Sequence, residues 1–116
     1  MSAIIKILLA RDLLLDLLKL DISSHSLNKR GKELKITLLN GISLYIVFND
    51  FNQYSYTIQY SQSKLNRIRF DNFDDHWNVP SNPHHCHIQN SKDVVSSPME
   101  GNPGSDIPKL VDYIKQ

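Results

Sequence analysis

Four segments in the middle of the chain have the hydrophobic pattern of β-strands: 34–38, 42–48, 54–60 and 65–70. In each of them apolar or aromatic residues either alternate with polar ones or form a short apolar run, as the residues of buried or half-buried strands do. Only a few residues separate one segment from the next. Since a parallel pair needs a crossover of roughly a dozen residues or more, these short connections predict an antiparallel sheet.

The connection after the first segment has the sequence of a tight hairpin turn. Asn40-Gly41 stands between the two strand patterns. A type I′ turn needs positive φ at both central positions, and Asn and Gly tolerate this conformation best. Two briefer strand patterns follow near His85–Ile88 and Val94-Val95. We therefore predict a sheet of about four to six strands.

Helices are predicted at both ends of the chain. The segment Ala3–Leu20 consists largely of strong helix formers, and Asp12, Asp16 and Lys19 form one polar stripe at i, i+4 and i+7. Apolar residues near the C-terminus recur at i, i+3, i+4 and i+7, which predicts a short amphipathic helix: Ile107, Leu110, Val111 and Ile114. Ser105 and Asp106 are its candidate N-caps.

The length of the chain bounds the number of domains. A chain of 116 residues is the size of one ordinary domain and can fold without a disulfide or a structural metal. We therefore predict a single α+β domain over residues 1–116. It consists of an N-terminal helix, an antiparallel sheet and a short C-terminal helix.

Composition and charge argue against several classes of protein. Thirteen basic and twelve acidic residues leave a formal net charge of +1, so no global charge draws the chain to nucleic acid. Cys86 is the only cysteine, and nothing therefore requires an oxidising compartment. Charged residues interrupt the apolar N-terminus, which predicts neither a membrane span nor a signal peptide. We expect a cytoplasmic protein.

A local basic cluster remains as a possible contact to RNA. The polar segment 23–32 predicts a loop, and in and beside it lie Lys29, Arg30, Lys32 and Lys35. These side chains are either solvated charges or RNA-binding residues. Tyrosines on one face of the third strand can stack on bases if they are exposed, although such a stripe is more often core: Tyr54, Tyr56 and Tyr60.

The segment 69–87 carries the densest chemistry, with one arginine, three aspartates and four histidines. If the segment from His85 to His87 is extended, these two imidazoles emerge on one face and Cys86 on the other. Paired imidazoles can act as general base and general acid near neutral pH, and a guanidinium can stabilise a phosphate. Metal-independent RNA cleavage uses these groups. The candidate catalytic residues are His85, His87, Arg69 and Asp71.

Two alternatives remain open for the same residues. His85 and His87, with His76 and a carboxylate of Asp71 or Asp75, are ligand types suited to zinc or another transition metal. In a structural role, Asp71 and Asn72 would instead hydrogen-bond the backbone of the loop that follows. The main prediction includes neither a metal nor a cofactor, and metal binding belongs to the alternative of a non-catalytic binding or regulatory module.

The same segment resembles the TumE family of toxins from type II toxin–antitoxin pairs. The resemblance rests on Arg69-Phe70-Asp71-Asn72 and on Pro83-His84-His85-Cys86-His87, followed by a turn and a terminal helix. Where the family pattern has Pro-His-His-Pro, this chain has Asp74-Asp75-His76-Trp77. The resemblance implies a toxin that a cognate antitoxin protein holds inactive, with RNA as a plausible target.

The first helix predicts a partner interface. Leu14 and Leu18 lie one turn apart, as do Leu13 and Leu17, and the two pairs are displaced by about 100° around the helix axis. One pair is therefore expected in the core and the other at its margin, or in the interface of a homodimer or an antitoxin complex.

Overall fold

The computed structural model describes residues 1–28, 30 and 32–115 and contains two helices and seven strands. The elements follow one another in this order: α1 (Ala3–Leu17), β1 (Ile22–Asn28), β2 (Glu33–Leu38), β3 (Ser43–Phe48), β4 (Tyr54–Gln59), β5 (Arg67–Asp71), β6 (His85–His87), β7 (Val94–Ser96) and α2 (Pro103–Ile114).

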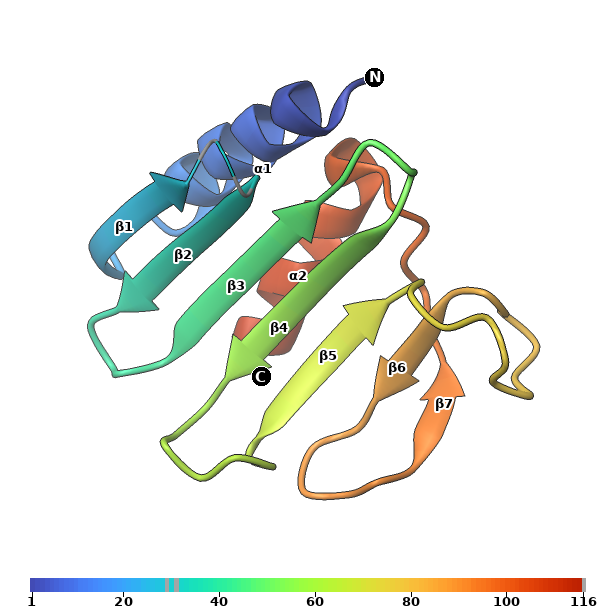
Figure 1. The fold of residues 1–116 in the computed structure, drawn as a ribbon. Helices are drawn as coiled ribbons and strands as arrows, with labels where there is room; N and C mark the ends of the chain where they lie inside the picture. Colours follow the sequence, from blue (N-terminus) through green and yellow to red (C-terminus); the bar gives the residue numbers. More distant parts are fainter. Residues whose placement is uncertain (29, 31, 116) are drawn as a thin grey trace.

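All seven strands form one sheet whose spatial order is the order of the sequence, β1 to β7 (Figure 1). Each strand is antiparallel to its neighbours. This confirms the predicted α+β class, the antiparallel pairing and the two terminal helices. The number of strands is seven, slightly above the four to six that were expected.

The additional strand is β1, which occupies part of the predicted loop at 23–32. Its apolar residues, Ile22 and Leu27, are five positions apart and would lie on opposite faces of a regular strand. A register shift between Ile22 and Ser24 brings Ile22 opposite Leu38 and Leu27 opposite Leu34. Both apolar side chains then pack against the core. Because of the bulge, the sequence of this strand does not show a regular alternation of apolar and polar residues. The prediction of a loop is therefore wrong for residues 23–28.

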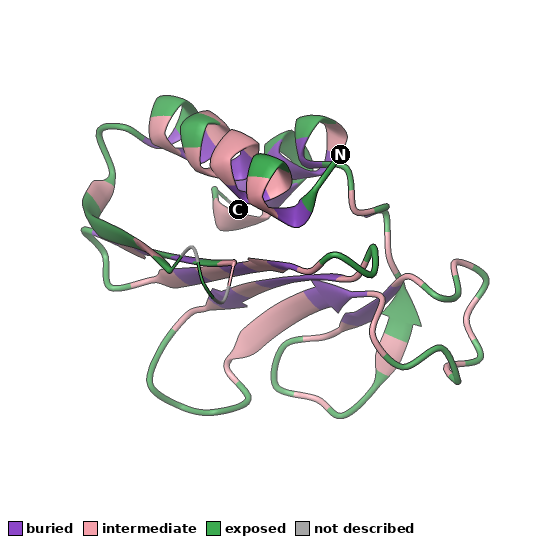
Figure 2. Cartoon of the chain, turned by 45° about the horizontal axis from the view of Figure 1, so that its top comes forward, coloured by how far each residue is buried: buried purple, intermediate pink, exposed green. Residues whose placement is uncertain are grey.

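Both helices lie on one face of the sheet (Figure 2), and α1 packs against α2 and against β2 and β3. The core between the two layers contains the inward-facing residues of the central strands, such as Ile36, Leu44, Ile46, Tyr56 and Phe70. In the described part of the chain, no helix covers the opposite face, which we call the open face (Figure 2). On it stand the side chains that alternate with the core residues.

The two leucine pairs of α1 differ in burial as expected. Leu14 and Leu18 are buried, whereas Leu13 packs at the margin of the core and Leu17 is exposed. The helix is regular to Leu17, three residues short of the predicted end. Within the residues that the structure describes, no helix is both long and apolar enough to cross a membrane.

The C-terminal helix begins earlier than the capping pattern predicted. Asn102 is its N-cap, and the Asn102 side chain accepts a hydrogen bond from the backbone N–H of Gly104. Asp106, which was a candidate cap, is buried inside the helix. Its carboxylate accepts hydrogen bonds from Tyr56 Oη at 2.7 Å and from the backbone N–H of Gly101 at 2.7 Å. This buried carboxylate joins α2 to the centre of the sheet.

Candidate functional site

The candidate site lies where β5 pairs with β6. Arg69 stands opposite His87, and Asp71 stands opposite His85. The residues between them, Phe70 and Cys86, are also paired and point into the core. The four candidate catalytic side chains therefore share the open face, as the spacing of His85 and His87 predicted.

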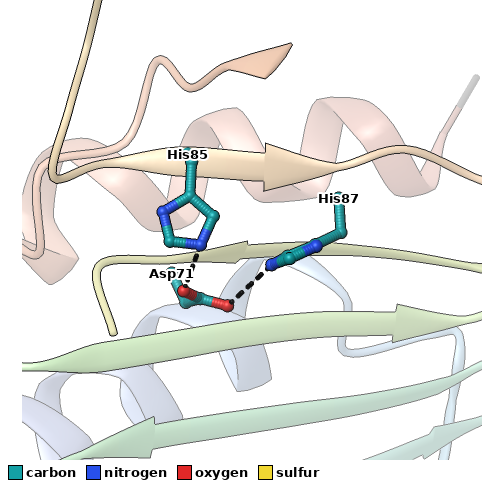
Figure 3. A group of neighbouring side chains, drawn as sticks. All are labelled: Asp71, His85 and His87. Carbon is teal, nitrogen blue, oxygen red and sulfur yellow. Dashed lines mark ion pairs between the residues drawn. The ribbon is translucent and has the colours of Figure 1, made fainter. Parts of the chain in front are cut away.

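The Asp71 carboxylate lies between His85 and His87 (Figure 3) and also contacts Arg69. Its Oδ1 atom lies 2.7 Å from Nε2 of His85, and its Oδ2 atom lies 2.7 Å from Nε of Arg69 and 3.5 Å from Nε2 of His87. Asp71 is itself buried. The buried Asp71 carboxylate thus contacts three groups that can carry a positive charge. A buried charge needs such partners, because it has lost its contact with water.

His85 is fully buried, and both of its ring nitrogens face acceptors. Nδ1 lies 2.9 Å from the carbonyl oxygen of Pro83, which can only accept a hydrogen bond, so Nδ1 carries a hydrogen. Nε2 lies 2.7 Å from Oδ1 of Asp71, and Nε of Arg69 lies 2.7 Å from Oδ2. Neither N–H bond meets hydrogen-bond geometry, so both are close polar contacts rather than aligned hydrogen bonds.

His87 differs from His85 because part of its ring reaches solvent. Its side chain is 27% exposed and that of Arg69 is 39% exposed. Partial burial lowers the pKa of His87 below 6.5, the charges of His85, Arg69 and Arg67 lower it further, and Asp71 opposes them. His87 is therefore neutral at neutral pH and can accept a proton there.

Comparison with known proteins decides the family. The family model described as toxin TumE matches residues 9–116, nearly the whole chain. The chain belongs to the TumE toxin family. Neither the curated proteins nor the solved structures gave a match.

In this TumE family member, the segment that departs from the family pattern places an indole beside the histidines. The ring centroid of Trp77 lies 5.7 Å from that of His85 and 5.6 Å from that of His87. The Trp77 Nε1–H group is buried and finds no hydrogen-bond partner among the described residues. Sequence analysis assigned Trp77 no role in the site beyond its place in the departing segment, although it is the chain's only tryptophan.

Of the four basic residues that were predicted to bind RNA, the structure describes three and disperses them. Lys29 lies outside the described residues, and Arg30 is exposed near the β1–β2 turn. Lys32 forms an ion pair with Asp50, with Nζ 2.5 Å from Oδ2. Only Lys35 is placed on the open face, where its Nζ lies 5.7 Å from the ring centroid of Tyr45. Of the three side chains that the structure describes, Lys35 is therefore the one on the surface that carries the histidines.

The predicted tyrosine stripe is mostly core, as such stripes usually are. Tyr54 and Tyr56 are buried, so they are not placed to stack on bases, and Tyr60 is half-buried. Sequence analysis did not single out two open-face residues, Tyr45 and Arg67. Arg67 stands two positions before Arg69 on β5, so strand alternation alone would have placed both guanidinium groups on one face.

In the described part of the chain, three side chains lie close enough together to bind one metal ion. One ligand atom each from Asp71, His85 and His87 lies within 4.8 Å of the others. The other two predicted ligands, Asp75 and His76, are exposed and do not belong to this group. The Arg69 guanidinium already contacts Asp71, and its positive charge opposes the binding of a cation at the same oxygen.

Asn72 hydrogen-bonds the backbone, as the structural alternative expected, but its partners lie at the β3–β4 turn and not in the loop that follows β5. Asn72 Oδ1 accepts a hydrogen bond from the backbone N–H of Tyr54, and its Nδ2 donates to the carbonyl oxygen of Asn52. Asn72 thus ties the end of β5 to the β3–β4 turn. Asp71, by contrast, contacts side chains, and this leaves it available for the chemistry of the site.

Proposed function

We propose that this TumE family toxin cleaves RNA without a metal and that His87 is the residue that accepts the proton in the reaction. The observation that carries the proposal is the shared Oδ2 atom of Asp71, which lies 2.7 Å from Arg69 Nε and 3.5 Å from His87 Nε2. Both partner side chains are partly exposed. A neutral imidazole and a phosphate-binding guanidinium are therefore held side by side at the surface.

The proposed reaction is an attack of the ribose 2′-hydroxyl on the adjacent phosphorus. The Asp71 carboxylate near Nε2 of His87 favours the tautomer with its hydrogen on Nε2, which leaves Nδ1 to take the 2′-hydroxyl proton. The 2′-oxygen bonds to phosphorus, and the bond from phosphorus to the 5′-oxygen breaks. Arg69 stabilises the charge that develops on the phosphate, and the leaving oxygen takes a proton from water or from an acidic side chain.

The role of His85 in this reaction has two testable forms. As the general acid that the sequence suggests, His85 would donate its proton to the leaving oxygen, and the segment around Trp77 would have to move to expose the ring. In its buried position, His85 instead acts as a positioning residue that holds Asp71. We propose the positioning role, because Pro83 and Asp71 face both ring nitrogens.

The experiment compares His87→Ala, Arg69→Ala and His25→Ala toxins on single-stranded RNA with excess EDTA. His25 is an exposed histidine on β1, remote from the site in the sheet order, and its variant serves as a matched control. We expect 2′,3′-cyclic phosphate ends from the parent and control proteins, and a loss of rate of about 10²- to 10⁴-fold for His87→Ala. Folded His87→Ala protein that cleaves at the parent rate would exclude His87 as the base.

His85→Gln separates the two roles of that residue. If His85 positions Asp71, the variant lowers the rate but retains the shape of the pH profile. If His85 is the general acid, the descending limb of the profile disappears. Growth arrest on expression of the same variants tests whether RNA cleavage is the toxic activity.

We further propose that a cognate antitoxin binds the toxin and that α1 contributes to the interface. Membership in a toxin family supports an antitoxin partner. On α1 and just after it, Ile5, Leu17 and Leu20 are exposed. A homodimer is the competing use of this surface, and light scattering of the toxin alone and with its antitoxin distinguishes the two.

A non-catalytic module that binds a metal is the second candidate function. The favouring observation is the close group of ligand atoms from Asp71, His85 and His87. The measurement is the metal content of protein purified without an affinity tag. A stoichiometric metal that His87→Ala protein lacks, together with an absence of RNA cleavage, would favour the module over the nuclease.

A further inference from the structure

One straight row of side chains crosses the open face of the sheet from β2 to β6. The strand register places Lys35 opposite Tyr45, Tyr45 opposite Thr57, Thr57 opposite Arg69 and Arg69 opposite His87. Neighbouring strands are about 4.8 Å apart, so the four steps of this row span roughly 19 Å. Lys35 and Tyr45 at one end of the row therefore lie on the same surface as Arg69 and His87 of the proposed site at the other end.

A hollow of about 860 Å³ adjoins the row between the β2–β3 turn and the β4–β5 connection. Its lining includes three cations, two tyrosines and an amide: Lys35, Lys64, Arg67, Tyr45, Tyr60 and Gln59. No Asp or Glu belongs to the lining that the structure describes. The hollow is therefore positively charged, although the whole chain has a formal charge of only +1.

The cations of this hollow are available to an anionic ligand. Within the described residues, no ion pair involves Lys35, Lys64 or Arg67, whereas Lys32 and Arg11 are paired with aspartates. Arg67 and Arg69 alternate on β5, so their Cα atoms are roughly 6.6 Å apart along the strand. Arg67 lines the hollow and Arg69 stands opposite His87, so the two guanidinium groups extend from the hollow to the proposed site. The charge of Arg67 also reaches His87, since it helps to lower the pKa of that histidine.

The chemistry of this surface matches an unpaired polynucleotide. Cations spaced along one line bind successive phosphates, and an accessible aromatic ring stacks on a base whose faces are not covered by base pairing. Tyr45 is half-buried on the open face and is the aromatic residue of the row. A sheet surface with cations and an accessible aromatic ring suits single-stranded RNA, in which unpaired bases can turn towards the protein.

We propose that the hollow and the row from Lys35 to His87 form a binding track for single-stranded RNA. Lys64, Arg67 and Arg69 bind its phosphates, Tyr45 stacks on a base, and the track delivers a phosphate to His87. The choice of RNA as the ligand rests on the proposed ribonuclease function. Binding along the track does not depend on cleavage and is measured separately.

The test measures the binding of a fluorescent 2′-O-methyl RNA strand, which lacks the attacking hydroxyl and is not cleaved. The variants are Tyr45→Ala and the double variant Lys64→Ala with Arg67→Ala. Their matched controls are Phe51→Ala and Lys19→Ala, which change an exposed aromatic and an exposed cation away from the row. Lys64→Glu with Arg67→Glu gives a second variant that alters the charge of the hollow without removing Tyr45.

We expect Tyr45→Ala to weaken binding about tenfold, as the loss of one stacked base does. The double alanine variant should weaken binding at least as much and lower the salt dependence, by about 0.7 in log–log slope for each lost phosphate contact. The controls should bind like the parent, and a duplex of the same sequence should bind more weakly than the single strand.

Several results would overturn the track. They are unchanged binding by folded double variants of either kind, equal binding of duplex and single strand, or no binding by the parent protein at low salt. Binding that depends on the track without any cleavage of ordinary RNA would instead contradict the proposed nuclease and leave the track in place. Cleavage that is insensitive to all track variants would contradict the track alone.

Discussion

At the scale of single residues, Asp71 is the side chain on which the other members of the site depend. Its two oxygens contact Arg69, His85 and His87, and it is almost completely removed from solvent. A buried carboxylate is tolerated only with such partners, and the partners in turn need its charge. Asp71 should therefore affect both stability and activity.

Asp71→Asn tests this dependence with a side chain of the same size. We expect the free energy of unfolding to fall by roughly 2 to 4 kcal/mol, because the buried His85 ring and the Arg69 guanidinium both lose the carboxylate that they contact. Urea unfolding measures the change, and Asp75→Asn, an exposed carboxylate in the same segment, should remain within about 0.5 kcal/mol of the parent. Equal stability of Asp71→Asn and parent would contradict the ion-pair role.

His87 should make both activity and stability depend on pH. Its pKa is lowered in the folded protein, so the unfolded chain binds a proton first as the pH falls below 6.5. Stability from this residue is complete above pH 6.5 and declines towards the lower, folded pKa. The ascending limb of kcat/KM should also have its midpoint below 6.5, because the base must be neutral.

An NMR titration of the His87 ring measures this pKa directly, and His87→Gln should remove its part of the pH dependence of unfolding. A midpoint for His87 above 6.5 would show that the Asp71 charge outweighs burial and neighbouring cations. A larger fraction of the base would then be protonated at neutral pH than the proposal assumes.

At the scale of elements, α1 has one surface that is buried in the core and another that lies at the margin of the core. Leu14 and Leu18 are buried between helix and sheet, whereas Leu13 and Leu17 retain contact with solvent. Charge at the marginal pair should be tolerated by the fold because a lysine there can extend its ammonium group into water.

Leu13→Lys with Leu17→Lys should leave the toxin folded and abolish its association with the antitoxin or with a second copy. Light scattering measures the mass, and circular dichroism measures the fold. Ser23→Lys with Ser24→Lys places the same charge on exposed residues of β1 and serves as the control. Unfolding of the leucine variant would show that both pairs belong to the core, and an unchanged complex would exclude α1 from the interface.

The β1 strand and the start of α2 show what local patterns miss at this scale. A bulge in β1 places Ile22 and Leu27 on one face, so no regular alternation is visible in the sequence. The first turn of α2 contains Pro103 and Gly104 and was therefore not recognised as helical. By contrast, β6 was predicted well because His85 and His87 are separated by one residue on a short extended segment.

At the scale of the whole molecule, one sheet is covered on one side by two helices, and α2 connects the end of the chain to its beginning. Ile107, Leu110 and Val111 are buried, and α2 packs against α1. Full burial of an aliphatic side chain contributes about 1.5 to 3 kcal/mol. Three such residues therefore amount to much of the 5 to 15 kcal/mol that is roughly typical of domain stability.

A chain that ends at Pro98 should consequently lose its cooperative fold. Deletion of α2 removes this apolar surface and leaves Tyr56 without its carboxylate partner, Asp106. The expected result is a loss of near-ultraviolet circular dichroism and of a cooperative urea transition. Asp112→Asn, a change at an exposed position of the same helix, should leave both intact. A cooperative transition in the shortened chain would show that the sheet and α1 suffice.

The sequence by itself determined the class of fold, the antiparallel pairing and the shared face of His85 and His87. These features depend on local periodicity and on turn chemistry, which act over a few residues. Only the tertiary structure decided that Arg69 faces His87, that His85 is buried and His87 is not, and that Lys35, Tyr45 and Arg67 lie on the same open face. These depend on strand register and on which side the helices cover, and so on contacts between residues far apart in the chain.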